Sequence, residues 1–293
     1  MSNLRMGRVH LATGLRHFER GETPAARMEL ERALWHDDSL EDAYAPLADA
    51  CLLMGDAQEA ERFATRGLEL FPGNLDCLES RADARFTLGN LPGTGADADA
   101  ILKEDEESVS ALCAKATVAL SGRRPHDAIA LLEKAIELEP EDSDILLSLG
   151  NAYLVAKNFS QAQARLVAAG ELDPLNALIY LSLCSLELMR GDPATGLRYS
   201  NVVIVLGGES PSLNALRGQF FLQLERPEDA EEALIEAVAG NPRDAVSMLC
   251  LAELEVESPA KAQAASDHAR RALELLPRAD VELRARAVLA RSE

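Results

Sequence analysis

Histidine and cysteine are the residues of this chain best suited to metal binding or nucleophilic chemistry, and neither forms a recognisable constellation. Among the five histidines, only His10 and His17, seven residues apart, share one face of a helix. A protein zinc site needs at least three ligands, and no third ligand is evident near this pair. The sequence has no glycine-rich phosphate loop, Gly-x-Ser-x-Gly motif or Cys-x-x-Cys pair. We therefore expect no catalytic site, no metal and no cofactor, and we interpret the two histidines as packing residues of a terminal repeat.

The cysteines indicate a reducing compartment. They are far apart in the sequence and odd in number, and the first residues lack the apolar segment of a secretory signal. Each cysteine has alanine or leucine close by in a helical pattern, so we interpret them as small packing residues. From this pattern we expect a cytoplasmic protein. The five residues are Cys51, Cys77, Cys113, Cys184 and Cys250.

The charge balance narrows the class of partner. The chain has 29 Lys and Arg against 49 Asp and Glu, a net charge of −20. Such a field repels phosphate backbones and anionic membranes, so we expect neither nucleic acid binding nor membrane insertion. No apolar run approaches the roughly 18 residues of a membrane span. A basic protein segment is the partner that this charge favours.

Four regularly spaced prolines indicate the helical repeats that must position any binding residues. Pro72, Pro140, Pro174 and Pro242 are separated by 68, 34 and 68 residues, all multiples of 34. A fixed period of 34 residues is typical of stacked helix pairs, since one pair alone cannot bury its apolar face.

Residue types recur in phase with this period. A small residue stands in the middle of each first helix, where two helices must approach closely, and a bulky residue follows four positions later. Glycines then end several first helices, because glycine tolerates the left-handed conformation of a helix end. We expect this role for Gly122 as well, one residue early. The small residues are Gly14, Ala48, Ala82, Ala116, Gly150, Cys184, Gly218 and Ala252.

The clearest copy of the pattern resembles the tetratricopeptide repeat (TPR) family. Leu149-Gly150, Tyr153, Ala162, Leu166, Ala169 and Pro174 follow the family's Leu-Gly-x-x-Tyr, Ala-x-x-x-Phe and Pro pattern, with leucine in place of phenylalanine. The resemblance implies an all-α, right-handed α-solenoid of about eight helix-turn-helix repeats in one domain, 1–293, with a C-terminal capping helix at 280–293. The expected repeats are 7–40, 41–74, 75–108, 109–142, 143–176, 177–210, 211–244 and 245–279.

In a stack of this family, the first helices line a concave groove, and helical spacing then selects the groove residues. Asp49 and Asp83 fall in a mostly polar mid-helix column, where they would contact a ligand or only face solvent. Acids at helix starts have a second interpretation, because carboxylates there cap the helix and complement its dipole. We favour capping for Asp42, Asp76 and Asp144. The predicted acidic wall of repeats two and three is Asp42, Asp49, Asp76, Glu79 and Asp83.

Repeats five and six have apolar residues at the corresponding positions. This second zone would accept an apolar side chain or one face of an amphipathic helix, or its leucines would only close a tighter superhelix. Gln219 continues the polar column into repeat seven. The zone comprises Leu147, Val155, Leu178, Leu181 and Met189, beside Asn151 and Ser185.

These observations favour a non-catalytic adaptor that binds a basic or amphipathic segment of one or more partner proteins in its groove. Two alternatives remain open. Exposed edges of the terminal repeats would let copies of the chain assemble into homo-oligomers. The chain would otherwise be a non-catalytic regulatory subunit of an enzyme or of a secretion or motility complex.

Overall fold

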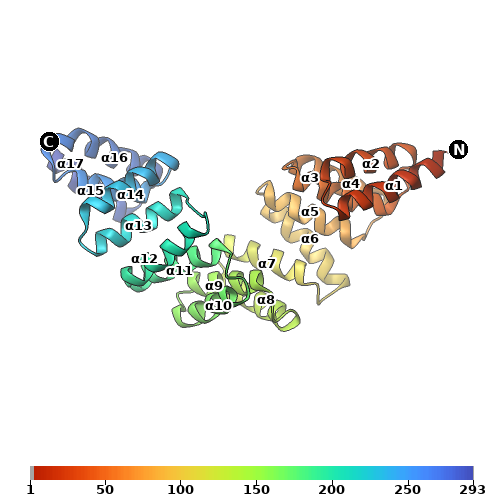
Figure 1. Cartoon of the computed structure of the whole chain (residues 1–293), viewed down its shortest axis with the longest axis horizontal. Helices are drawn as coiled ribbons and strands as arrows, with labels where there is room; N and C mark the ends of the chain where they lie inside the picture. The colour runs from red at the N-terminus through yellow and green to blue at the C-terminus, as the bar shows by residue number, and fades with distance from the viewer. Residues whose placement is uncertain (1–2, 293) are drawn as a thin grey trace. The chain divides into compact units, whose positions relative to one another are not determined.

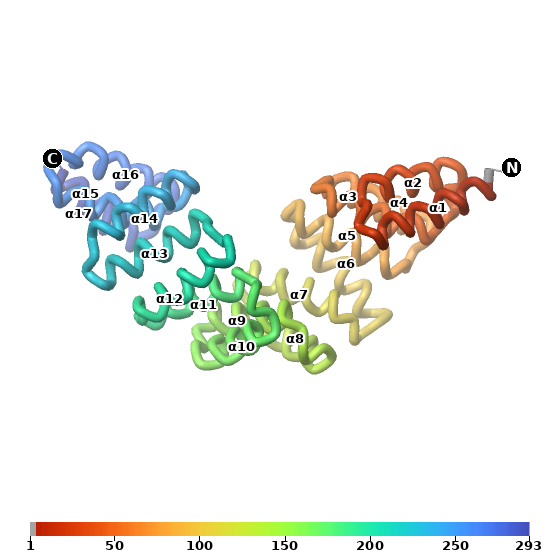
Figure 2. The backbone as a smooth tube through the Cα atoms, viewed as in Figure 1, coloured from red at the N-terminus to blue at the C-terminus, as the bar shows by residue number. Residues whose placement is uncertain are grey.

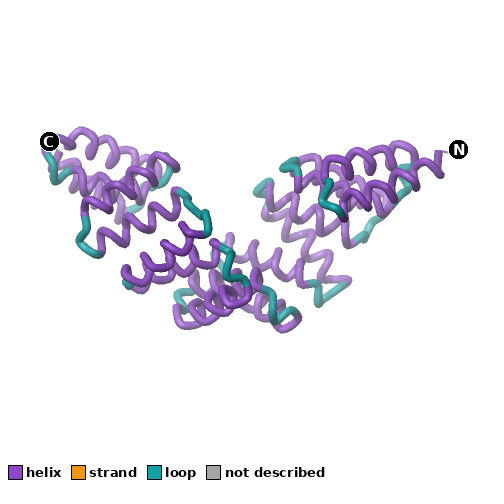
Figure 3. The backbone as a smooth tube through the Cα atoms, in the orientation of Figure 1, coloured by secondary structure: helices purple, strands orange, loops and turns teal. Residues whose placement is uncertain are grey.

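The computed structural model describes residues 3–292, and these form seventeen α-helices and two short 3₁₀ helices without a strand. The helices follow one another as antiparallel pairs joined by short turns (Figures 1 and 3). Tertiary contacts divide the chain into two compact units, 1–141 and 142–293. The chain is therefore an all-α solenoid, as its period predicts.

Unit 1 contains four helix pairs. In the first three pairs, the second helix also packs against the first helix of the next pair. Side chains of Asp56, Asn74, Asn90 and Ser108 accept backbone N–H groups where helices begin, which satisfies donors that the helix itself leaves unpaired. The helices are α1 (Asn3–Glu19), α2 (Thr23–His36), α3 (Tyr44–Leu53), α4 (Ala57–Leu70), α5 (Leu75–Thr87), α6 (Leu91–Glu104), α7 (Val109–Ser121) and α8 (Pro125–Leu138), with η1 (Glu41–Ala43) before α3.

Unit 2 repeats this arrangement and ends in a single helix, as the tube in Figure 2 shows. The last helix packs on the pair before it and buries Val281, Ala285 and Val288 in their shared core. The helices are α9 (Ser143–Val155), α10 (Phe159–Leu172), α11 (Ala177–Arg190), α12 (Pro193–Val205), α13 (Pro211–Gln223), α14 (Pro227–Gly240), α15 (Ala245–Glu255), α16 (Ala262–Leu275) and α17 (Ala279–Ser292), with η2 (Pro259–Lys261) before α16.

The column of small residues lies where the two helices of a pair cross. All eight residues of the column are buried. A Cβ atom added to Gly150 would lie 2.7 Å from side-chain atoms of Leu166, which is itself fully buried. Because real Cβ contacts are not that short, the crossing distance of this pair depends on the absence of a side chain.

The turns within the pairs confirm most of the glycine prediction and correct one part. Gly21, Gly55, Gly89 and Gly191 all have positive φ, as expected for helix ends in the left-handed conformation. Gly122 does end α7, as expected, but its φ is −77°, so the left-handed conformation expected of it is wrong. The left-handed residue of that turn is Arg123, with φ of 56°, at the same position in the repeat. Lys157 and Glu225 occupy the equivalent positions of later repeats with φ of 59° and 56°.

Within each unit, the first helices form the inner side of the curve. Neighbouring first helices, such as α3 and α5 in unit 1 or α11 and α13 in unit 2, contact each other more extensively than neighbouring second helices do. A stack whose members are closer on one side curves toward that side. Side chains of the first helices that point away from the second helices therefore lie on the inner side of their unit.

Candidate functional site

The inner side of unit 1 carries a group of carboxylates on α3 and α5. Asp49 lies in the middle of α3, and Asp76, Glu79 and Asp83 lie along α5. Asp42 lies in the 3₁₀ turn before α3. We call these five residues the inner acidic face.

Serine hydroxyls tie part of this face together. The Ser80 hydroxyl donates to Asp49 Oδ1 at 2.6 Å and so links α5 to α3. The Ser110 hydroxyl donates to Glu79 Oε1 at 2.5 Å and links α7 to α5. The two contacts hold these carboxylates in place without neutralising their charge.

The electrostatics of the face are unfavourable in the free protein. Burial raises the pKa of Asp49 most, and the carboxylates of Asp76 and Glu79 raise it further, against the opposing hydrogen bond from Ser80. Desolvation likewise raises the pKa of Asp83, followed by repulsion from Asp49 and Glu79. No lysine or arginine among residues 3–292 forms an ion pair with any of the five carboxylates. The face therefore carries uncompensated negative charge that a bound cation would relieve.

The capping interpretation of the helix-start acids is wrong. Asn74 caps α5 by accepting the Cys77 N–H at 2.8 Å, and Asp76 lies two residues later, within the first turn, without a capping bond. The cap of α9 is Asp142, which accepts the backbone N–H of Asp144. Asp42 makes no capping bond either, because no side chain caps the turn Glu41–Ala43. The prediction thus placed the caps of α5 and α9 two residues too late in the sequence.

The apolar zone predicted for unit 2 is only partly on the surface. Leu147 is buried in the core, so its prediction as a groove contact is corrected. Val155 and Met189 are exposed near the ends of α9 and α11. Leu178 is also exposed but lies eleven residues before Met189 on α11, about 16 Å along the axis. The structure thus does not bring the exposed apolar residues into one patch.

The remaining predicted residues of unit 2 are half-buried and largely satisfied within their own helices. Ser185 donates its hydroxyl to the carbonyl of Leu181 at 3.1 Å, and Gln219 donates to the carbonyl of Ala215 at 3.4 Å. Asn151 is half-buried in the same column. These side chains offer a ligand less unpaired polarity than the carboxylates of unit 1.

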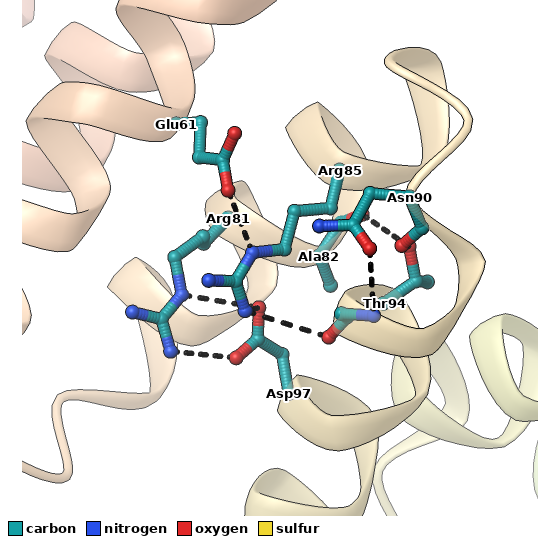
Figure 4. Close-up of polar contacts among 8 residues, drawn as sticks. Glu61, Arg81, Ala82, Arg85, Asn90, Thr94 and Asp97 are labelled. Atoms are coloured by element: carbon teal, nitrogen blue, oxygen red, sulfur yellow. Dashed lines mark hydrogen bonds and ion pairs between the residues drawn. The ribbon is translucent and has the colours of Figure 1, made fainter.

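A polar cluster between α4, α5 and α6 was not predicted from the sequence (Figure 4). Arg81 forms a two-bond contact with Asp97, at 3.1 Å from Nε and 2.6 Å from Nη2. Arg85 donates to the same carboxylate at 2.7 Å and to Glu61 at 2.8 Å. The Asp97 side chain is 3% exposed. We call these four residues the Asp97 cluster.

A signal for this cluster was present in the sequence. Arg81 occupies a repeat position where Leu47, Leu149 and Leu183 are buried. A cation at a position where other repeats bury a leucine needs a buried counter-charge. Such a counter-charge had to come from the neighbouring α6, which is poor in large apolar residues. The packing of the three helices buries the Asp97 carboxylate, whereas the arginine side chains remain 17% and 20% exposed.

Other chemistry is not evident in the part of the chain that the structure describes. No group of three or more His, Cys, Asp or Glu side chains there is arranged to hold a metal ion. His10 Nδ1 pairs with Glu29 at 2.6 Å, and His268 Nδ1 pairs with Glu255 at 2.8 Å, so each joins two helices of a terminal repeat. Within residues 3–292, no helix has the length and apolarity that a membrane crossing requires.

Comparison with models of known protein families supports the fold. Segments 119–186 and 216–280 each match a family model described as tetratricopeptide repeat. No curated protein matches the chain.

Solved structures resemble the chain at low sequence identity, which bears on the fold alone. A chain in the crystal structure of the APC/C hetero-tetramer Cut9–Hcn1 aligns with a TM-score of 0.76 and 15% identity, over 96% of this chain and 55% of that one. A tetratricopeptide repeat protein from Parabacteroides merdae gives 0.67 and 18%, over 85% of this chain and 98% of that one. Pseudomonas aeruginosa pilF gives 0.62 and 20%, over 75% and 99%. The chain thus spans little more than half of the first of these relatives.

Proposed function

The chain is a tetratricopeptide repeat protein, and we propose that it is a non-catalytic scaffold whose inner acidic face binds a basic segment of a partner protein. Repeats of this family generally mediate protein–protein interaction. The similar Cut9–Hcn1 structure is itself a hetero-tetramer, which accords with such a role for the fold. The proposal adds a location and a partner chemistry to that general role.

The uncompensated charge of the inner acidic face carries the proposal. Asp49 and Asp83 have raised pKa values because burial and neighbouring carboxylates disfavour their ionised forms. A lysine or arginine placed between the two helices would reverse the sign of the local field and form charge-assisted hydrogen bonds. The free energy that the free protein loses to repulsion would then become part of the binding free energy.

The second helices of unit 1 provide a contrast. Several acids of these second helices form ion pairs in the free protein, such as Glu61 with Arg85 and Asp99 with Lys115. Ion pairs that are satisfied in the free protein leave less to gain from a ligand. The acids of the inner side, by contrast, have no cation partner among the described residues.

A direct test measures the binding of a fluorescein-labelled hexalysine peptide to the full chain by fluorescence anisotropy, with a hexaglutamate peptide as the negative probe. We expect hexalysine alone to bind, and its affinity to fall about tenfold or more when salt rises from about 0.05 to about 0.5 M, because the Debye length shrinks. Asp49→Asn with Asp83→Asn should weaken binding by about tenfold, the effect of removing two charges from a partly desolvated site.

The matched control removes two charges from the second helices. Glu104 on α6 and Glu137 on α8 are exposed. Glu104→Gln with Glu137→Gln removes as many negative charges as the test variant. Equal losses in the two variants would mean that hexalysine responds only to net charge, and the proposed site would be wrong.

A further inference from the structure

Helix α1 has an unusual surface for this chain. Its sequence contains Arg5, Arg8 and Arg16 but only one acid, Glu19, and Arg20 follows directly, whereas the whole chain has a net charge of −20. None of these four arginines forms an ion pair with a residue in the range 3–292. The N-terminal helix is therefore a basic element on an acidic protein.

The arginines surround a helix face that the other repeats bury. Positions 5, 9, 16 and 20 fall on one side of a helix with 3.6 residues per turn. At the position of Val9, the next three repeats have Ala43, Cys77 and Ala111, each no more than 1% exposed because the preceding second helix covers it. Val9 is 54% exposed.

Arg16 likewise occupies a position that is buried in later repeats. Its equivalents in the next two repeats are Ala50 and Ala84, both fully buried. The repeat geometry thus makes this side of the helix a packing surface, and in the first repeat that surface carries exposed arginines around an exposed valine. We call Arg5, Arg8, Val9, Arg16 and Arg20 the α1 basic face.

A terminal repeat often carries a polar outer face only for solubility, and the sign of the charge argues against that explanation here. On a chain of net charge −20, acidic side chains would repel other copies and keep the chain soluble. Arginines at this position have the opposite effect, because they attract the acidic surface of other copies. The inner acidic face complements these arginines, because its carboxylates repel one another and have no cation partner among the described residues.

We propose that the α1 basic face of one copy docks on the inner acidic face of a second copy. This inference rests on the proposed function, since it names a second copy of the chain as a ligand of that face. Five carboxylates face four arginines, and Arg5 to Arg20 extend over about 22 Å of helix, enough to cross both α3 and α5. The contact joins different surfaces of the two copies, so it is heterologous and allows further copies to add.

The test measures molar mass by light scattering over a range of concentrations at low salt, with three full-length proteins. The wild type should associate with increasing concentration. Arg5→Glu with Arg16→Glu reverses the α1 basic face, and Asp76→Lys with Asp83→Lys reverses exposed charges of the inner acidic face without touching the Ser80 hydrogen bond. Each variant alone should be monomeric, with self-affinity lowered about tenfold or more.

Mixing the two variants provides the decisive comparison. One retains an intact acidic face and the other an intact basic face, so an equimolar mixture should associate again through that pair of faces. A mixture that stays monomeric, or a variant that still associates alone, would overturn the inference. Far-UV circular dichroism of each variant confirms that both are folded.

The hexalysine probe separates the inference from the proposed function. The Arg5→Glu and Arg16→Glu variant should bind hexalysine at least as tightly as the wild type. If hexalysine binds but the wild type stays monomeric at every concentration, the self-association inference fails and the proposed function stands. If hexalysine does not bind, both fail.

Discussion

Removing the buried carboxylate of Asp97 should destabilise unit 1 far more than removing an exposed carboxylate from the same helix. In Asp97→Ala, Arg81 loses both of its hydrogen bonds to the carboxylate, and Arg85 loses one bond but keeps Glu61 at 2.8 Å. Breaking a buried ion pair by deleting one partner costs about 3–5 kcal/mol, because the remaining charge is uncompensated.

The surroundings reduce this figure. The side chains of Arg81 and Arg85 are 17% and 20% exposed, so water can solvate part of each guanidinium after the change. We therefore expect a loss of about 2–3 kcal/mol. The control is Asp99→Ala on the same helix, whose carboxylate is 64% exposed and pairs with Lys115 at 2.7 Å. An exposed pair of this kind contributes about 1 kcal/mol or less.

The assay is urea unfolding followed by far-UV circular dichroism, together with amide hydrogen exchange of residues 91–104. The second measurement is needed because repeat stacks unfold in parts, and only exchange locates the weakened helix. A stability loss in Asp97→Ala no larger than that in Asp99→Ala would refute the account of the cluster.

A double variant tests the physical cause. Arg81→Leu added to Asp97→Ala removes the stranded charge and places leucine where Leu47 and Leu149 are buried. We expect it to recover at least about 1 kcal/mol of the loss, because uncharged side chains of similar volume often replace buried ion pairs without penalty. No recovery would mean that lost side-chain volume, and not the uncompensated charge, explains the instability.

Three further predictions concern the backbone and the inner acidic face. Lys157→Gly should raise the free energy of unfolding by about 0.5–1 kcal/mol in urea denaturation, because Lys157 has φ of 59° and glycine adopts this conformation without strain. Gly150→Ala should lower the free energy of unfolding by about 1–2 kcal/mol through the clash with Leu166. Gly170→Ala should leave it unchanged or raise it by up to about 1 kcal/mol, because the added Cβ meets its nearest atom at 3.6 Å. Equal effects of the two variants would contradict the close crossing of the helices at Gly150. Asp83→Asn should stabilise the fold by about 0.3–0.5 kcal/mol at pH 7. Because the folded-state pKa of Asp83 is raised, the ionised carboxylate destabilises the fold above that pKa. The stability gain of Asp83→Asn should therefore shrink as pH falls through the folded-state pKa and vanish below the pKa of the unfolded chain. A gain independent of pH in thermal melts would contradict the repulsion.

The sequence alone determined the repeat architecture of this protein. The period of 34 residues, the buried small residues and the left-handed glycines of four turns all follow from local spacing that recurs along the chain. Repetition makes such a pattern readable, since each repeat must solve the same packing problem with its immediate neighbours. The same period places the β-branched run of α12 in the second helix of a pair, and α12 is a helix in the structure.

Only the tertiary structure decided which polar residues satisfy each other. Sequence spacing assigned caps to Asp76 and Asp144, while the backbone geometry selects Asn74 and Asp142. Shifts of one or two residues at a helix start are beyond the resolution of a period, because several residues there can satisfy the same backbone donors.

The same limit applies to burial and charge. Leu147 is a groove residue by spacing and a core residue in the structure, because small rotations of a helix decide which edge of its apolar stripe is covered. The Asp97 cluster is formed by side chains from three helices, between positions 61 and 97 of the sequence. These side chains come into contact only when the helices pack. The carboxylates of the inner acidic face were predicted from the sequence, whereas their lack of counter-charges was established by the packing of the helices around them.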